Sequence, residues 1–581
     1  MNNEKVYAGK KGTKRSYPTR SRSKISNRKP PNRYSSENRS AENVSTSAKK
    51  LKSSDDLEIG VTNDFGYRIV HLFNALNIIS TLVKCKVCDH DIKFTEKSLC
   101  GLGFKIEVDC GHCEKVQINS CPMIDNAYEI NRRIVFSMRL LGVGLNGLMK
   151  FCAFMDLPRP IFQSFYDRIV NSISIATQAV SAVSKKKAAL EEKRISLENG
   201  MEDGIIVSGD GSWRKRGFSS LFGITSLIGW YTKKVIDVVV KSKYCKACQH
   251  WEAKEGTAEY WEWKSTHDDE CQANHSGSSG KMEVDSAVEM FQRSEELYGI
   301  KYKYYIGDGD SKTFLGISNS DPYNGFEIKK KECIDHVQKR MGARLREIVK
   351  KQKGLSGRGK LTGKLIDELS TYYGLAIRRN SDDVEKMRKD IWATIKHKIS
   401  TDSKPQHDDC PKGAESWCSW QRAVASGNIS EYRHKPPLPK EVLEAITPVY
   451  ENLSRDDLLQ RCLGGFTQNN NESFNKSVWA IAPKCQSGGK KIIDIAADIS
   501  VLLFNDGLRS LMKVLETLGV TIGPNCFNFC VETDAARIEQ AERSLTDAAK
   551  EARRASTSSR KVAGDRDLLL EGQLYGAGIA D

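Results

Sequence analysis

The 581-residue sequence predicts an α/β core in the middle of the chain, and two patterns indicate this fold class. Three β-rich runs with glycine-containing turns follow one another from residue 203, namely DGIIVSGDGSW, SSLFGITSLIG and KVIDVVVKSK. Val284, Ala287 and Phe291 then recur at helical spacing, and the aromatic strand KYKYYIGD comes next. Because a helix follows three strands and leads into a fourth, we expect a sheet covered by helices over residues 203–350.

Composition divides the rest of the chain into six segments. The first is rich in Ser, Asn, Pro and basic residues and has too few apolar residues to offset the entropy of ordering. The third shows apolar residues at helical spacing, and the fourth is mostly polar and helical in pattern. We expect a disordered basic tail (1–60), a four-cysteine zinc-ribbon-like domain (61–125), a helical DNA-binding segment (126–200), a mostly helical insertion (351–460), the final part of the core (461–525) and a charged helical tail (526–581).

Charge and cysteine content favour a nuclear protein that binds nucleic acid. The formal net charge is +16, and residues 1–52 hold fifteen Lys or Arg against three Asp or Glu, so 15 − 3 = +12 of it lies there. Such an arm is attracted to DNA phosphates through counterion release, and the basic stretch Lys10–Lys14 suits nuclear import. The seventeen Cys follow no secretory signal, so clustered Cys are interpreted first as metal ligands. A solvated tail that serves only import or solubility is the alternative for the arm.

The sequence also argues against a membrane protein and against a nucleotide-dependent enzyme. No run approaches the roughly 18 uninterrupted apolar residues that a membrane helix needs. No P-loop or Rossmann fingerprint occurs, since GLGF at 101–104 lacks the spacing of either. We therefore expect neither a membrane partner nor a nucleotide cofactor.

The strongest metal motif consists of two C-x2-C pairs. Cys85 and Cys88 form the first, Cys110 and Cys113 form the second, and twenty-one residues separate them. This spacing suits tetrahedral Zn²⁺, because each short turn presents two sulfurs and the spacer brings the pairs together. We expect a structural zinc ribbon, and the alternative is four unliganded core thiols.

A second cluster offers five ligands for four positions. Cys245 and Cys248 precede His267, Cys271 and His275, between a predicted strand and a predicted helix. A segment without a local core gains stability from a metal. We expect Zn²⁺ on Cys245, Cys248, His267 and Cys271, with His275 as the alternative ligand.

A third group has looser spacing. It comprises His407, Cys410, Cys418 and His434. These residues either bind a metal or are structural side chains around Trp417 and Trp420, and the sequence leaves both interpretations open.

Three aspartates lie at the ends of predicted strands. Asp210 ends the run IIVSGD, and Asp308 and Asp310 end the run YYIGDGD. Carboxylates that face one another at buried strand ends are tolerated chiefly when a divalent metal neutralises them. Two of them and one further acid can hold the metal pair used in phosphoryl transfer. Turn aspartates beside Gly are also common, so this pattern alone is weak.

Five stretches, in this order, resemble the Mutator-like transposase family found in animal genomes. They are SGDGSWRKRGFSSLFG, the Cys/His segment ending NHSGSSGKME, IGDGDSKTF, ECIDHVQKRMGARL and TQNNNESFNKSVW, and the resemblance covers roughly residues 60–525. It implies an RNase H-like catalytic core with an Asp-Asp-Glu (DDE) triad of Asp210, Asp308 and Glu472 that binds Mg²⁺ or Mn²⁺. Glu472 is assigned by its position, and Asp310 is the alternative to Asp308.

The intervals between these acids are 308 − 210 = 98 and 472 − 308 = 164 residues. The second interval is too long for one crossover and fits an inserted, mostly helical domain. Related transposase families carry a Cys-x-x-His pair shortly after the second aspartate. This resemblance implies supporting roles for Cys333 and His336.

The resemblance implies a DNA transposase of the cut-and-paste type, which binds transposon ends and catalyses metal-dependent strand cleavage and strand transfer. Its partners would be double-stranded DNA, as terminal repeats and target, and a second copy of the chain, since pairing two ends requires a homo-oligomer on DNA. Two alternatives remain. One is a transposase-derived, catalytically inactive nuclear DNA-binding zinc protein, and the other is an RNase H-like nuclease that acts on branched or hybrid substrates.

Overall fold

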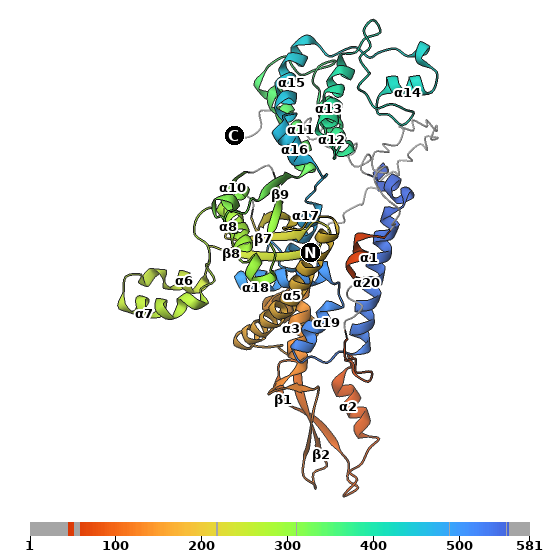
Figure 1. The fold of residues 1–581 in the computed structure, drawn as a ribbon. Coiled ribbons are helices and arrows are strands. Elements are labelled where there is room, and N and C mark those ends of the chain that lie inside the picture. The colour runs from red at the N-terminus through yellow and green to blue at the C-terminus, as the bar shows by residue number, and fades with distance from the viewer. Residues whose placement is uncertain are drawn as a thin grey trace, which may run out of the picture.

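The computed structural model describes residues 44–51, 58–215, 219–308, 311–486, 488–553 and 555–556. It is a mixed α/β structure with one five-stranded mixed sheet and many helices (Figure 1). Most of the basic tail predicted over 1–60 lies outside the described residues. Within it, however, Thr46–Leu51 forms helix α1, whose Ala48 and Leu51 are buried. The prediction of disorder is wrong for this turn, because its apolar residues pack against α20 (Pro524–Leu545).

The five-stranded sheet begins with an antiparallel meander. Its strands β6 (Ile205–Trp213), β7 (Phe222–Gly229) and β8 (Val235–Ser242) come from the three β-rich runs of the sequence. β9 (Tyr302–Gly307) pairs in parallel with β6, and β10 (Lys329–Glu332) pairs in parallel with β9. The order β10-β9-β6-β7-β8 therefore makes β6 the central strand.

Helices cover both faces of this sheet (Figure 1). Ile224 and Val238 point into one hydrophobic cluster, and Leu227 and Val239 point into another on the opposite face. Since both faces are covered, every residue of β7 is buried, and its sequence is mostly apolar and shows no alternation of apolar and polar residues. The helices are α5 (Gln163–Glu198), α17 (Asn469–Ile481) and α18 (Lys490–Asn505) on the first face, and α8 (Ser279–Gln292) and α10 (Ser311–Asn319) on the second.

The helices that precede the sheet share its core. α3 (Glu129–Leu140) and α4 (Leu145–Phe154) lead into α5, which packs along α18. Buried side chains such as Phe136 and Ile173 belong to the same hydrophobic cluster as the sheet. Among the described residues, no single helix is both long and apolar enough to span a membrane, and α3 and α4 meet these two criteria only as a pair that bends by 111°.

A small three-stranded sheet lies before α3 and extends away from the body (Figure 1). Its antiparallel order is β1-β2-β3, and every residue of these strands is described. Only Gly103 among them is buried, so the sheet has almost no hydrophobic core. The elements here are α2 (Leu72–Ser80), β1 (Lys93–Cys100), β2 (Gly103–Asp109), β3 (Val116–Asn119) and the hairpin of β4 (Met123–Ile124) and β5 (Ala127–Tyr128).

Six helices between β10 and α17 form a helical unit with its own hydrophobic cluster. Tyr373, Ile391 and Tyr450 are buried in it, together with Val337 and Leu345 of α11. These apolar residues of α11, the helix that follows β10, pack into the core of the helical unit and so connect it to the sheet. The helices are α11 (Ile334–Lys351), α12 (Gly363–Arg379), α13 (Val384–Ile399), α14 (Ser419–Ala425), α15 (Lys440–Leu453) and α16 (Asp456–Cys462), with a 3-10 turn at Ile429–Glu431.

The remaining helices include two in a projecting arm (Figure 1) and two from the C-terminal part of the sequence. The side chain of Asp534 fixes α20 to the body by accepting hydrogen bonds from the backbone N–H groups of Leu508 (2.9 Å) and Arg509 (3.0 Å). The arm contains α6 (Lys246–Trp251), a 3-10 turn (Glu252–Lys254), α7 (Ala258–His267) and a second 3-10 turn (Asp268–Glu270), while α9 (Ser294–Tyr298) follows α8 and α19 (Ser510–Thr517) precedes α20.

Candidate active site and metal centres

Asp210 and Asp308 lie at the same level of two neighbouring strands. Ser208 of β6 pairs with Ile306 of β9 in the parallel register, and each aspartate comes two residues later along its chain. Because side chains alternate along strands with a period of two, this register brings both carboxylates to the same end and face of the sheet. Asp210 is still within β6, and Asp308 directly follows β9, whereas Asp310 lies outside the described residues.

Polar side chains hold α17 against the central strand. They are spaced by three or four residues, so they share one face of the helix. Each donates a hydrogen bond to β6: Gln468 to the carbonyl oxygen of Gly209 (2.6 Å), Asn471 to that of Ser208 (2.9 Å), Asn475 to Oδ2 of Asp210 (2.8 Å) and Trp479 to Oγ of Ser212 (2.8 Å). The position of α17 along β6 is therefore fixed at four points.

Glu472 is on the same side of α17 as this row. It comes four residues after Gln468 and three before Asn475, and its side chain is exposed. Its negative charge acts on Asp210. The structure thus brings together Asp210, Asp308 and Glu472, which are up to 262 positions apart in the sequence (472 − 210).

Burial and the neighbouring acids shift the pKa of Asp210. Burial raises the pKa of Asp210 from 3.8 to about 6, with a further upward contribution from the negative charge of Asp308 and a smaller one from Glu472. The charge of His336 and the hydrogen bond from Asn475 act in the opposite direction. Ionising Asp210 in the metal-free protein is therefore costly, which is the condition under which a carboxylate cluster favours a cation.

The Cys-x-x-His pair lies beside this cluster, but its two side chains differ in environment. Cys333 is the N-cap residue of α11 and is buried, and burial raises the pKa of its thiol. His336 is half-buried, and its Nδ1 lies 3.0 Å from Oε1 of Gln468. Since the amide nitrogen of Gln468 donates to Gly209, its oxygen accepts the proton on Nδ1 of His336. His336 and Gln468 thus connect α11 and α17 to β6.

A family model for Mutator-like transposases matches residues 66–418. The chain belongs to the Mutator-like transposase family. No curated protein and no solved structure matches it. The matched region of this transposase-family chain includes Asp210, Asp308, Cys333 and His336 but ends before Glu472, so the position of Glu472 relative to the two aspartates comes from the packing of α17 alone.

Sequence reasoning missed two side chains that pack against the glycines on either side of Asp210. Glu283 of α8 approaches Gly211, where an added Cβ would lie 2.7 Å from its Oε2, and Tyr305 of β9 similarly occupies the space beside Gly209. Burial raises the pKa of Tyr305, and the charges of Glu283, Asp210 and Asp308 raise it further. The glycines on either side of Asp210 indicated such close approach. Nothing in the sequence of α8 distinguishes Glu283 from an ordinary helical glutamate.

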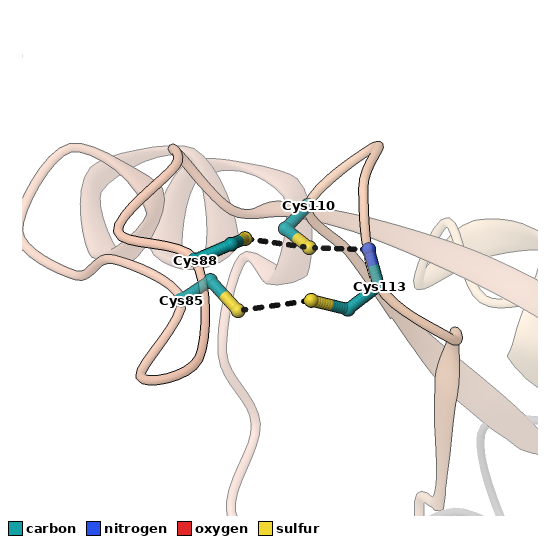
Figure 2. A group of neighbouring side chains, drawn as sticks. All are labelled: Cys85, Cys88, Cys110 and Cys113. Atoms are coloured by element: carbon teal, nitrogen blue, oxygen red, sulfur yellow. Dashed lines mark hydrogen bonds between the residues drawn. The ribbon is translucent and has the colours of Figure 1, made fainter.

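The four cysteines of the predicted ribbon converge from two loops (Figure 2). Sγ of Cys85 lies 3.9 Å from Sγ of Cys113, and Sγ of Cys88 lies 3.6 Å from Sγ of Cys110. A tetrahedron with Zn–S bonds of about 2.3 Å has edges of about 3.8 Å. These four residues could bind zinc, which would supply the stability that the coreless sheet β1–β3 lacks.

The second tetrad closes the base of the projecting arm. Sγ of Cys245 and Sγ of Cys248 each lie 3.3 Å from Nε2 of His267, and Cys248 lies 3.5 Å from Cys271. These four residues could bind zinc. The alternative ligand His275 points elsewhere, because its Nδ1 pairs with Asp285 at 3.2 Å.

The third tetrad differs from the predicted group in one ligand. His407, Cys410 and Cys418 come together as expected, but the fourth member is His397 of α13, and the tetrad could bind zinc. His434 is not a member of this tetrad, although its Nε2 lies 3.0 Å from Nε2 of His407. Sequence reasoning missed His397 because it lies inside a regular amphipathic helix, ten residues before the nearest other member, where no short Cys/His spacing marks it.

The projecting arm is acidic. Residues 246–270 contain three Lys and seven Asp or Glu, so their formal charge is 3 − 7 = −4. No residue of α6 or α7 is buried, and Trp251 and Trp263 stack with their ring centroids 5.0 Å apart. A surface of this charge repels DNA phosphates, so the basic segments elsewhere are better suited to contact DNA.

Proposed function

We propose that this protein is a DNA transposase with an RNase H-like core, in which Asp210, Asp308 and Glu472 hold Mg²⁺ or Mn²⁺. The observation that carries the proposal is that the parallel register of β6 with β9 and the hydrogen bond from Asn475 to Asp210 bring the three acids near one another, although they come from β6, the end of β9 and α17. Attraction between opposite charges does not explain why these three side chains lie near one another, because all three are carboxylates. Family membership makes transposition the natural interpretation of it.

The topology of the sheet supports the RNase H-like assignment. Three antiparallel strands are followed by two strands parallel to the first, and helices cover both faces. The first and fourth strands are neighbours, which is what a triad with its first two acids on those strands requires. The helical unit α11–α16 lies between the second and third acid, as the interval of 164 residues leads one to expect.

The donor set suits a hard divalent cation. Carboxylate oxygens are the preferred protein ligands of Mg²⁺ and Mn²⁺. Beside Asp210, Oδ1 of Asn475 is buried without a hydrogen-bond partner among the described residues, which fits a site that admits a hydrated ion. When bound, the metals would lower the pKa of the attacking hydroxyl group and neutralise charge on the phosphate.

The surrounding residues orient the three acids. Asn475 holds Oδ2 of Asp210 and so fixes the direction of the carboxylate. Gln468 and Asn471 fix the first turn of α17, which carries Glu472. His336 donates from Nδ1 to Gln468, and this hydrogen bond fixes the orientation of its ring beside α17. No covalent enzyme intermediate is needed, since water and then the freed 3′-hydroxyl group serve as nucleophiles.

We further propose how the protein recognises its partners. The ribbon and the helices α3–α5 would read the terminal repeats, and the basic tail would contact phosphates without sequence preference. Pairing two transposon ends requires at least a dimer on DNA, and action on chromosomal DNA requires entry into the nucleus. The acidic arm would not contribute to DNA affinity.

Cleavage and joining of terminal-repeat DNA with Mg²⁺ tests the proposal, with the repeats taken from the DNA that flanks the gene. We expect the full chain to nick and join these ends, and Asp210→Ala, Asp308→Ala and Glu472→Ala each to fall to background while still binding the DNA. Asp285→Asn, a carboxylate of α8 that pairs with His275, is the matched control and should remain active. Unchanged activity in Asp210→Ala would exclude this site, and inactivity of the unmodified chain with intact binding would favour the inactive DNA-binding alternative.

A further inference from the structure

We propose that the helical unit contains a third structural zinc site, formed by His397, His407, Cys410 and Cys418, and that His434 orients one of its ligands without binding the metal. This site lies outside the proposed catalytic centre and does not depend on it. His407, Cys410 and Cys418 are buried, with exposed fractions of 3%, 3% and 0%. All four ligand atoms lie within 4.8 Å of one another.

The distances between these atoms match the edges of a zinc tetrahedron. Bonds of about 2.3 Å to sulfur and 2.0–2.1 Å to nitrogen give edges of about 3.3 Å between two nitrogens and about 3.6 Å between nitrogen and sulfur. Nδ1 of His397 lies 3.2 Å from Nδ1 of His407. Sγ of Cys418 lies 3.5 and 3.4 Å from these two nitrogens, and Sγ of Cys410 lies 4.0 and 3.7 Å from them. Two thiolates and two imidazoles in this geometry select zinc.

The second nitrogen of His407 belongs to a hydrogen-bonded chain that suits a metal ligand. With Nδ1 directed to the metal, Nε2 carries the proton and lies 3.0 Å from Nε2 of His434 and 2.9 Å from Oγ of Ser400, so either side chain can accept it. His434 then donates from Nδ1 to Oδ1 of Asp402 at 2.6 Å. One choice of tautomers therefore satisfies the whole chain from Asp402 through His434 to His407. A carboxylate and an imidazole in this relation fix the orientation of a zinc-bound histidine.

The segment that carries three of the ligands has no hydrophobic core of its own. All residues from 396 to 437 are described, and none of them belongs to a hydrophobic cluster of the structure. Trp417 stacks on Tyr372 of α12 with ring centroids 4.3 Å apart, and Asp409 forms ion pairs with Lys389 (3.2 Å) and Lys396 (2.6 Å) of α13. The zinc would bind this segment to α13 through His397, and so replace the hydrophobic core that the segment lacks.

Zinc content of the purified full chain tests the proposal by elemental analysis. We expect three Zn²⁺ per chain, and two in His397→Ala and in Cys418→Ser. Cys462→Ser removes a buried thiol of the same helical unit that is outside every tetrad, so it should keep three. His434→Ala should also keep three but release one of them to a chelator about 10- to 100-fold more readily. Two zinc ions in the unmodified chain would overturn the proposal, and so would a loss of zinc in His434→Ala with retention in His397→Ala.

X-ray absorption at the zinc edge gives a second measurement that does not depend on variants that fold. The three tetrads together offer nine sulfurs and three nitrogens (4 + 3 + 2 and 0 + 1 + 2), which is a mean of three sulfurs and one nitrogen per zinc. The first two tetrads alone would give seven sulfurs and one nitrogen for two ions. The second ratio, measured on the unmodified chain, would contradict the third site.

Discussion

Nδ2 of Asn475 donates a hydrogen bond of 2.8 Å to Oδ2 of Asp210, and this contact joins the helix that carries Glu472 to the strand that carries the first aspartate. It explains why Glu472, which lies outside the residues that the family model matches, is near Asp210, which lies within them. The contact also lowers the pKa of Asp210 against the upward effect of burial and of Asp308. Asn475 is therefore a positioning residue for the proposed metal site.

Replacing Asn475 by Ala is expected to weaken Mg²⁺ binding. The change frees Oδ2 of Asp210 and removes one of the contacts that align α17, and loss of a residue that supports a metal ligand typically costs 10- to 100-fold in affinity or activity. The Mg²⁺ concentration for half-maximal strand cleavage measures the effect. Ser477→Ala is the control, because Ser477 bonds only within its own helix. Equal Mg²⁺ requirements for both variants would contradict the positioning role.

Asp210→Asn is expected to stabilise the metal-free protein above pH 6. The folded-state pKa of Asp210 is raised from 3.8 to about 6. Ionised Asp210 therefore lowers the free energy of unfolding of the unmodified chain. This loss is absent below pH 3.8, grows between pH 3.8 and 6, and is complete above pH 6. Asn carries no charge and accepts the same hydrogen bond from Asn475. The free energy of unfolding of the variant should therefore exceed that of the unmodified chain by about 1–2 kcal/mol, which is less than the full pKa shift implies because Asp210 is partly exposed.

Thermal unfolding at pH 4 and pH 8, without divalent metal, checks this expectation. The variant should unfold at a higher temperature than the unmodified chain at pH 8 and at nearly the same temperature at pH 4. Added Mg²⁺ should reverse the order at pH 8. Asp203→Asn is the control with the opposite sign, because Lys303 lowers the pKa of this exposed carboxyl. A less stable Asp210→Asn variant at pH 8 without metal would contradict the raised pKa of Asp210.

Replacing one cysteine of the second tetrad is expected to unfold the projecting arm and no other part of the protein. Cys271→Ser should lose one zinc ion, because α6 and α7 have no buried residues that could hold them together without the metal. Hydrogen exchange should show lost protection in residues 246–270 and unchanged protection in β6–β8. Affinity for DNA should stay the same, since the arm is acidic. Reduced DNA affinity in this variant would assign the arm a role that its charge does not predict.

The basic tail and the ribbon are expected to contribute differently to DNA binding. Deleting residues 1–43 leaves α1 in place and removes twelve Lys or Arg and three Glu, a formal charge of 12 − 3 = +9. Affinity should fall for all sequences, and its dependence on salt should become weaker. Cys85→Ser should instead unfold the ribbon and abolish the preference for terminal repeats over scrambled duplexes.

Binding to both duplexes at several salt concentrations distinguishes these roles. Cys526→Ser, a half-buried thiol outside the tetrads, controls for the loss of a cysteine. If the deletion removes sequence preference and the ribbon variant keeps it, the division of labour is wrong.

The sequence predicted elements better than their arrangement. β6, β7 and β8 were predictable because β-branched runs are bounded by glycines and polar turns. The parallel pairing of β9 with β6 was not, since it depends on contacts across about 100 residues that leave no periodic signal. α1 was missed because its six residues are helical only where α20 offers a partner.

In the candidate sites, too, residues with a local sequence signal were predictable and residues brought in by long-range packing were not. Cys85, Cys88, Cys110 and Cys113 were predictable from spacing, because both halves of the ligand set are local pairs. His397 was not, because it lies in an ordinary helical sequence and reaches the third tetrad only through packing, and the contact of Glu283 with Gly211 likewise left no signal in the sequence of α8. Glu472 came from resemblance to a family, and its polar neighbours Gln468 and Asn475 became visible only in the docking of α17 on β6.

Iron-directed cleavage of the protein backbone tests most directly whether Asp210, Asp308 and Glu472 hold a divalent metal, and it requires no knowledge of the DNA substrate. Fe²⁺ takes the place of Mg²⁺, and ascorbate with peroxide then generates hydroxyl radicals that cut the chain next to the bound ion. Fragment masses should place cuts near residues 210, 308 and 472, and these cuts should disappear with excess Mg²⁺ or in Asp210→Ala. Cuts confined to the Cys/His tetrads, or cuts near the acids that Mg²⁺ does not suppress, would contradict the proposed metal site.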